Sequence, residues 1–79
     1  MKARIKITLK NGVLDPQGKA IEGALSSLEF TGVDNVRQGK YIELDLNETD
    51  ETKARAQVDA MCQKLLANTV IENYEVELG

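Results

Sequence analysis

The sequence contains no histidine and no tryptophan, and it has a single cysteine, Cys62, among its 79 residues. One cysteine cannot form a disulfide within the chain, and the ordinary zinc sites built from cysteine and histidine are excluded as well. The missing histidine removes the general base of the common Ser–His and Cys–His catalytic pairs. Because a domain this small often gains stability from metals, disulfides or association, the sequence predicts that the chain associates with itself or with partners.

Long hydrophobic runs are also lacking, since no segment approaches the roughly 18 apolar residues typical of a membrane span. The first residues, 1–6, alternate between apolar and charged side chains and do not form the apolar centre of a signal peptide. The net charge of −3 disfavours binding to the phosphates of nucleic acids. We therefore expect a cytoplasmic protein that binds neither membranes nor nucleic acids.

The N-terminal part of the chain predicts a strand followed by a helix. Residues 3–10 alternate strictly between apolar and polar side chains and are rich in β-branched types, as in a half-buried strand. Asp15 is a good N-cap, and Pro16 suits the first helical position. The predicted helix ends before Gly32, and its apolar stripe consists of Ile21, Ala24, Leu25 and Leu28.

Three further segments have strand character. Residues 33–37 predict a short second strand, and Gln38-Gly39 predicts a hairpin tip that joins it to a third strand over residues 41–46. Residues 72–78 alternate again and predict the last strand.

A second helix is predicted between the last two strands. Thr49 or Asp50 would be its N-cap, and Asn68 would end it. Cys62 belongs to its apolar face, where a cysteine packs as a small hydrophobic residue and does not act as a nucleophile. The residues of that face are Ala54, Val58, Met61, Cys62 and Leu65.

The predicted order is strand, helix, strand, strand, helix, strand, which is the ferredoxin-like βαββαβ arrangement of the α+β class. We expect one domain over residues 1–79, with a four-stranded antiparallel sheet and two helices on one of its faces. The other face would place cations of a central first strand opposite carboxylates of its neighbours. This face is either a solvated, self-neutralised surface or a polar contact for a sister subunit. Its charged residues are Arg4, Lys6, Lys10, Glu43, Asp45, Glu75 and Glu77.

No set of residues indicates catalysis, and no phosphate-binding or dinucleotide-binding glycine motif is present. RNA-binding domains of this topology use aromatic residues on the open face, where only Tyr41 is predicted to lie.

Two segments remain of interest. The cations of residues 37–40 fit either a solvated turn or a site for a phosphate or an acidic partner loop. The helix start after residues 10–17 fits either simple capping by Asp15 or an anion site.

Three blocks of the chain resemble the PurS family. They are Lys10–Gly18 (KNGVLDPQG), Val36–Lys40 (VRQGK) and Cys62–Tyr74 (CQKLLANTVIENY), in the order in which the family has them. The first and third blocks are long enough to be specific, and the resemblance covers the whole chain. Thr69 is a departure, because many relatives carry proline there.

The resemblance implies a small non-catalytic subunit of phosphoribosylformylglycinamidine (FGAM) synthase, a glutamine- and ATP-dependent carbon–nitrogen ligase of de novo purine biosynthesis. Such a subunit forms homodimers or homotetramers and bridges a glutaminase subunit and a large synthetase subunit, supporting ammonia transfer. The chain itself would hold no cofactor and no metal, and ATP and Mg would be used by the large subunit. The alternative is a ferredoxin-like regulatory module that binds a small molecule and forms sheet-paired dimers.

The resemblance also suggests which side chains contact the partners. The candidates are the residues of the matching blocks that we expect to be exposed. These partner-interface candidates are Asp15, Gln17, Arg37, Lys40, Asn68 and Glu72. Their structural alternatives are helix capping for Asp15, turn solvation for Arg37 and Lys40, and helix termination for Asn68.

Overall fold

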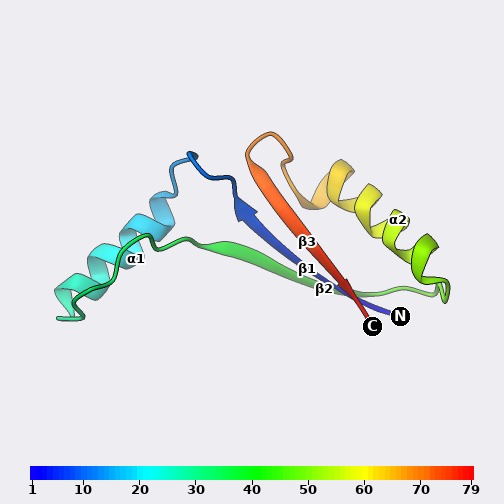
Figure 1. Cartoon of the computed structure of the whole chain (residues 1–79), viewed down its shortest axis with the longest axis horizontal. Helices are drawn as coiled ribbons and strands as arrows, with labels where there is room; N and C mark the ends of the chain where they lie inside the picture. Colours follow the sequence, from blue (N-terminus) through cyan, green and yellow to red (C-terminus); the bar gives the residue numbers. More distant parts are fainter.

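The computed structural model describes residues 1–79 and contains three strands and two helices (Figure 1). The strands form one antiparallel sheet in the order β2-β1-β3, so the first strand is central, as predicted. None of the helices is both long enough and apolar enough to cross a membrane. The elements are β1 (Lys2–Leu9), α1 (Pro16–Ser27), β2 (Gly39–Asp45), α2 (Glu51–Met61), the π-helical turn η1 (Cys62–Leu66) and β3 (Glu72–Leu78).

The predicted four-stranded sheet is wrong, because residues 33–37 do not form a strand and the expected hairpin tip at residues 38–39 does not exist. The backbone of this segment is bonded to side chains instead of to a neighbouring strand. The N–H of Val36 donates to the Glu22 carboxylate at 3.4 Å, and the N–H of Gln38 donates to the Asp15 carboxylate at 2.8 Å. The segment therefore runs along α1 and enters β2 directly at Gly39.

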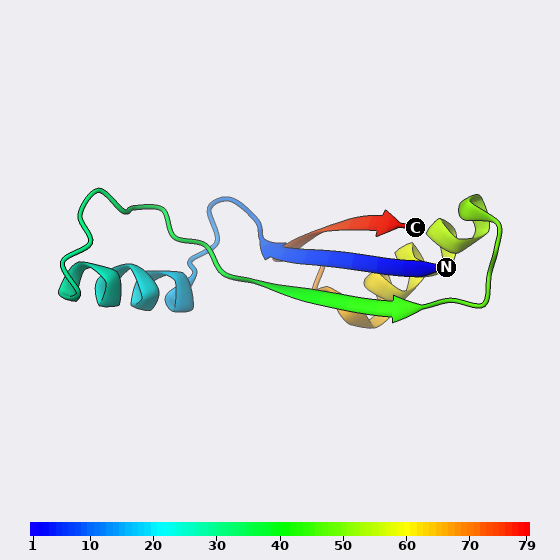
Figure 2. The same cartoon turned by 90° about the horizontal axis from the view of Figure 1, so that it is seen from below.

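The prediction of two helices on one face of the sheet is also wrong. Only α2 covers the sheet, whereas α1 projects beyond the end of the strands (Figure 2). The chain is consequently elongated, with extents of 49 × 24 × 15 Å and a radius of gyration of 15.9 Å. A compact domain of this length has a radius of gyration of about 12 Å. We call residues 11–38, which contain α1 and its two connections, the arm.

The core lies between β1 and α2. Ala3, Ile5 and Ile7 of β1 are fully buried against Val58 and Cys62, as the alternating pattern and the helical stripe predicted. The inward side chains of β2 and β3 are only half-buried, because a single helix covers three strands. These half-buried side chains are Ile42, Leu44, Tyr74, Val76 and Leu78.

The prediction for the apolar face of the second helix is wrong at the C-terminal end of that helix, where Leu65 does not face the core. The N–H of Ala67 donates to the carbonyl of Cys62 at 3.0 Å, which is the i→i+5 bond of a π turn. The wider turn rotates the following residues, so Leu66 packs against the core while Leu65 is 83% exposed. The helical segment ends before Asn68, whose backbone forms the next turn.

A group of five residues, which we call the clasp, joins the arm to the sheet. The buried carboxylate of Asp15 caps α1 by accepting the N–H of Gly18 at 2.8 Å, and its other oxygen accepts the N–H of Gln38. Asp15 was therefore predicted correctly as the N-cap, but the sequence did not predict that it also accepts the N–H of Gln38. The clasp residues are Asp15, Gly18, Val36, Arg37 and Gln38.

The guanidinium of Arg37 completes the clasp. It donates to three backbone carbonyls at 3.1–3.3 Å. These carbonyls lie at the end of β1 and in the connection that follows it. A Cβ at Gly18 would overlap the carbonyl oxygen of Val36, so the helix and the returning chain approach as closely as only glycine permits. The accepting carbonyls belong to Leu9, Lys10 and Val13.

Substitution of Gly18 should therefore weaken the clasp. Gly18→Ala forces the Val36 backbone to move, and overpacking of this kind costs about 1–3 kcal/mol. We expect a lower free energy of unfolding in urea and faster hydrogen exchange at the Gln38 amide. Gly23→Ala is the matched control, because a Cβ there meets nothing within 4 Å. The control should stabilise the chain by about 0.5–1 kcal/mol, and equal stabilisation by both changes would contradict the steric account.

Candidate partner interface

The six candidate residues lie near one end of the sheet, where β1 ends and β2 and β3 begin. The structure divides them into two groups and one isolated side chain. Asp15 and Arg37 belong to the clasp, and both use their polar atoms within the chain. Gln17 lies exposed on the first turn of α1.

The second group joins the starts of β2 and β3. The Nζ atom of Lys40 lies 3.5 Å from a carboxylate oxygen of Glu72, and the other oxygen of Glu72 accepts the N–H of Asn68 at 2.7 Å. The side chain of Asn68 accepts the N–H of Val70 at 3.2 Å and so shapes the turn before β3. Sequence reasoning missed the Lys40–Glu72 pair, which follows from the register of β2 and β3 on either side of β1.

Exposure separates the candidates that are free to meet a partner from those that are not. The side chain of Lys40 is 56% exposed, whereas that of Glu72 is only 14% exposed. Gln17 and Asn68 are exposed, and Asp15 is buried. Arg37 is exposed as well, but its guanidinium is already bonded to carbonyls of its own chain. A partner would therefore meet Gln17, Lys40 and Asn68 with unoccupied or mostly exposed side chains, and the contact role of the candidates stays a prediction.

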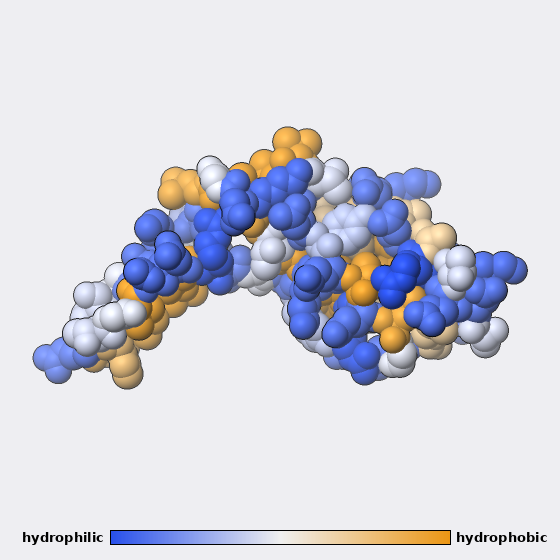
Figure 3. Space-filling model, in the orientation of Figure 1, coloured by the Kyte–Doolittle hydropathy of each residue, from blue (hydrophilic) through white to orange (hydrophobic).

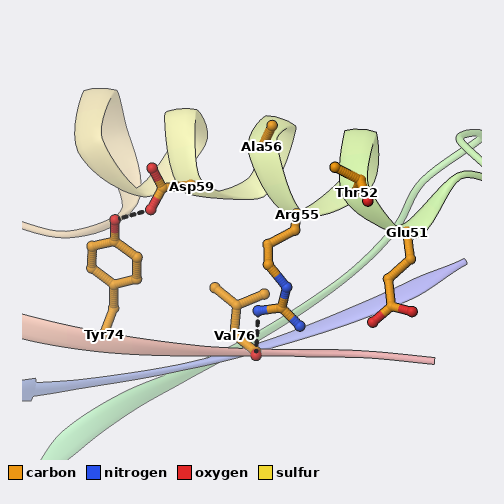
Figure 4. A pocket seen from close by; sticks show the side chains of 7 residues that line it. All are labelled: Glu51, Thr52, Arg55, Ala56, Asp59, Tyr74 and Val76. Atoms are coloured by element: carbon orange, nitrogen blue, oxygen red, sulfur yellow. Dashed lines mark hydrogen bonds between the residues drawn. The ribbon is translucent and has the colours of Figure 1, made fainter.

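A pocket of about 630 Å³ runs between α2 and the outer edge of β3 (Figure 4). Arg55 donates to the carbonyl of Val76 at 3.3 Å and so occupies a free backbone acceptor of this edge strand. The hydroxyl of Tyr74 donates to Asp59 and accepts from the amide of Gln63 at 2.9 Å. These bonds tie α2 to β3 and cover an edge that would otherwise remain open.

The surroundings of Tyr74 and Cys62 keep both side chains protonated. The hydrogen bond to the Asp59 carboxylate raises the pKa of Tyr74, so its hydroxyl stays protonated. Burial raises the pKa of the Cys62 thiol, which suppresses the reactive thiolate. The only cysteine therefore packs in the core, as predicted.

The sheet face opposite α2 carries the predicted charge pattern except for Lys10, which lies beyond the end of β1. Arg4 lies opposite Glu43 on one side and Glu77 on the other, and Lys6 lies opposite Glu75. The Lys2 ammonium lies 3.5 Å from the Glu43 carboxylate. Exposed pairs of this kind contribute little to stability, and a contact with a sister subunit through this face stays a prediction.

Comparisons with known proteins agree with one another. The profile of the PurS family, described as phosphoribosylformylglycinamidine (FGAM) synthase, matches residues 2–79. The synthase subunit PurS of Synechocystis sp. is 55% identical over 75 residues, which cover 95% of this chain and 75% of that protein. The structure of Bacillus subtilis PurS is similar with a TM-score of 0.85 at 47% identity, covering 96% of this chain and 94% of that one. The structure of PurLQS from Thermotoga maritima is similar with a TM-score of 0.87 at 36% identity, covering 96% and 93%.

The buried carboxylate of Asp15 predicts a dependence of stability on pH. The N–H groups of Gln38 and Gly18 and the nearby Arg37 guanidinium hold the pKa of Asp15 below its usual value. A carboxyl group with a lowered folded-state pKa stabilises the fold above its unfolded pKa of about 4. This contribution is lost as the pH falls through the folded-state pKa.

We therefore expect Asp15→Asn to lower the melting temperature at pH 7 and to converge with the wild-type chain in acid. Thermal unfolding followed by circular dichroism between pH 7 and pH 2 measures both. Asp45→Asn, at an exposed position at the end of β2, is the control and should match the wild type at pH 7. Equal melting temperatures of Asp15→Asn and wild type at pH 7 would refute the role of the carboxylate.

Proposed function

This chain belongs to the PurS family, the small subunit of phosphoribosylformylglycinamidine synthase in purine biosynthesis, and we propose that it couples the other subunits without supplying a catalytic group. It bridges a glutaminase subunit, which releases ammonia from glutamine, and a large synthetase subunit, which installs the nitrogen. The match over residues 2–79 carries this proposal. The similar Thermotoga maritima structure is of PurLQS, whose name joins PurS to PurL and PurQ, and this supports the identity of the partners.

The form of the chain suits a coupling role. Only nine of 79 residues are buried, and many large apolar side chains are exposed. This apolar surface is available for contacts with other proteins. The most exposed aliphatic residues are Leu14, Leu28, Leu65 and Val70. A rigid scaffold that holds two enzymes together helps to exclude water from the space between their sites, which limits the loss of ammonia.

The remaining parts of the proposal concern the assembled enzyme. ATP and Mg act in the large synthetase subunit, and the present chain supplies no ligand to them. The chain works in the cytoplasm as a homodimer or homotetramer. Gln17, Lys40 and Asn68 form the exposed part of its contact with a larger subunit.

Reconstitution tests the coupling role. Glutaminase and large synthetase subunits of a PurS-dependent enzyme are assayed with glutamine, with and without this chain. Because coupling requires the bridge, we expect glutamine-dependent activity to fall at least about tenfold without it, equivalent to about 1.4 kcal/mol. Activity with ammonium chloride should be retained, because free ammonia needs no bridge. Equal glutamine-dependent activity in both mixtures, or loss of both activities together, would refute a coupling role.

Substitution of the exposed candidates tests the contact surface. In the same assay, Gln17→Ala with Lys40→Ala should raise the chain concentration needed for half-maximal activity about tenfold. The fold should be little affected, because Gln17 is exposed and Lys40 is the mostly exposed member of its pair with Glu72. Asn47→Ala with Lys53→Ala, at exposed positions beyond the opposite end of the sheet, is the control. If both double variants behave like the wild type, Gln17 and Lys40 are not contacts.

A further inference from the structure

Strand β3 lies at the edge of the sheet, so one side of its backbone has no strand beside it. The N–H of Gly79 donates to the carbonyl of Lys2 at 3.0 Å, which fixes the alternation of hydrogen bonds along the ladder between β1 and β3. The backbone N–H and C=O groups of Tyr74, Val76 and Leu78 therefore point away from β1. We call this row of backbone groups the outer edge of β3.

One side chain covers the outer edge of β3, and it covers the edge only in part. Arg55 donates to the carbonyl of Val76 at 3.3 Å, while the other groups of the outer edge form no hydrogen bond within the chain. Unpaired donors and acceptors along a strand pair readily with an extended segment of another chain. Arg55 can give way to such a segment, because Glu51 precedes it by four residues on the same side of α2, a spacing that suits an ion pair (Figure 4).

The pocket between α2 and β3 gives an added strand room for its side chains. Its volume is about 630 Å³, and its lining includes Ala56, Tyr74 and Val76 beside the outer edge. Figure 3 shows apolar atoms bordered by hydrophilic ones over the half of the molecule that contains α2 and β3. Since successive side chains of a strand point to opposite faces of a sheet, every second side chain of an added strand would point toward this pocket.

The charges along the edge favour a cationic occupant. Glu75 and Glu77 are exposed on the open face of the sheet, with Lys6 and Arg4 opposite them on β1 and no residue of the chain opposite them on the outer side. Side chains directly opposite one another on neighbouring strands lie about 5 Å apart and interact. An added strand that carried Lys or Arg at these positions would therefore be attracted. The pocket adds two further carboxylates against a single guanidinium.

A second copy of β3 is a poor occupant of this edge. Two such strands paired about a two-fold axis would bring the carboxylates of Glu75 and Glu77 against their own copies, and like charges in opposite positions are destabilising. Acidic side chains on an edge strand thus discourage self-pairing and select a basic partner.

We propose that a larger subunit of the synthase adds an extended basic segment to the outer edge of β3. The backbone of this segment pairs with Tyr74, Val76 and Leu78, and its cationic side chains lie opposite Glu75 and Glu77 on the open face. The side chains between them enter the pocket beside α2. This inference rests on the proposed function, because it takes the segment from a larger subunit. Its tests measure binding and hydrogen exchange, so that the two can fail separately.

Neutralisation of the two carboxylates tests the charge match. The full chain is titrated into each purified larger subunit, with glutamine and ATP present, and binding is followed by fluorescence anisotropy. Glu75→Gln with Glu77→Gln should raise the dissociation constant for one of these subunits about tenfold at low salt. The difference should shrink as salt is added, because exposed charges are screened.

A matched control removes the same charge from the other edge of the same face. Glu43→Gln with Asp45→Asn changes two exposed carboxylates of β2 and should bind as the wild type does. Circular dichroism checks that both double variants are folded. Equal dissociation constants for the two double variants would overturn the proposal.

Hydrogen exchange tests the pairing of the backbones. In the free chain the amides of Glu75 and Glu77 are protected by the ladder with β1, whereas those of Tyr74, Val76 and Leu78 should exchange rapidly. Addition of a strand should slow exchange at these three amides at least about tenfold in the complex. The outward amides of β2 are the control and should not change.

The possible failures of this experiment have different meanings. Unchanged exchange along the outer edge in a complex that forms would overturn the proposal and leave the coupling role intact. Slow exchange at the same amides in the free chain at micromolar concentration would assign the edge to a second copy and would overturn the proposal as well. If the chain binds neither larger subunit, the proposed function fails together with this inference.

Discussion

The conformation of this chain depends on one buried carboxylate. Asp15 ends the connection from β1, caps α1, and accepts the N–H of Gln38 just before β2 begins. A buried carboxylate is costly unless its oxygens are satisfied, and here the backbone donors come from the first turn of α1 and from the segment that returns to β2. The direction of α1 is therefore set at its first turn, through the same side chain that starts the helix.

The position of α1 limits how much apolar surface this small domain can bury. With α1 held away, only one helix covers the sheet, and the core is limited to β1, α2 and the inward side chains of the flanking strands. A compact chain of this size is already marginal because it buries a small share of its surface. The clasp fixes a conformation that is poor in burial, so a molecule that covered its exposed apolar surface would stabilise the fold.

The local features of the fold could be predicted from the sequence, whereas the features set by distant contacts could not. Alternation identified β1 and β3, and the Asp15-Pro16 pair identified the start of α1, because these signals involve neighbouring residues. Residues 33–37 have the composition of a strand, but the bonds of Val36 and Gln38 to Glu22 and Asp15 decide their conformation. The exposure of Leu65 follows from a π turn that has no pattern in the sequence.

For the candidate contact residues too, the sequence could show the residue types but not the distant contacts that each side chain makes. The sequence identified exposed and buried members of the matching blocks alike, since it could not show which side chains bond within the chain. An arginine such as Arg37 is a common residue type in protein contacts, but its guanidinium binds three carbonyls of its own chain. Lys40, in contrast, remains mostly exposed beside the partly buried Glu72. The clasp and the exposed candidates meet at one end of the sheet, so any shift of α1 also moves Gln17 relative to Lys40. The contact proposed at this end would therefore depend on the orientation of the arm.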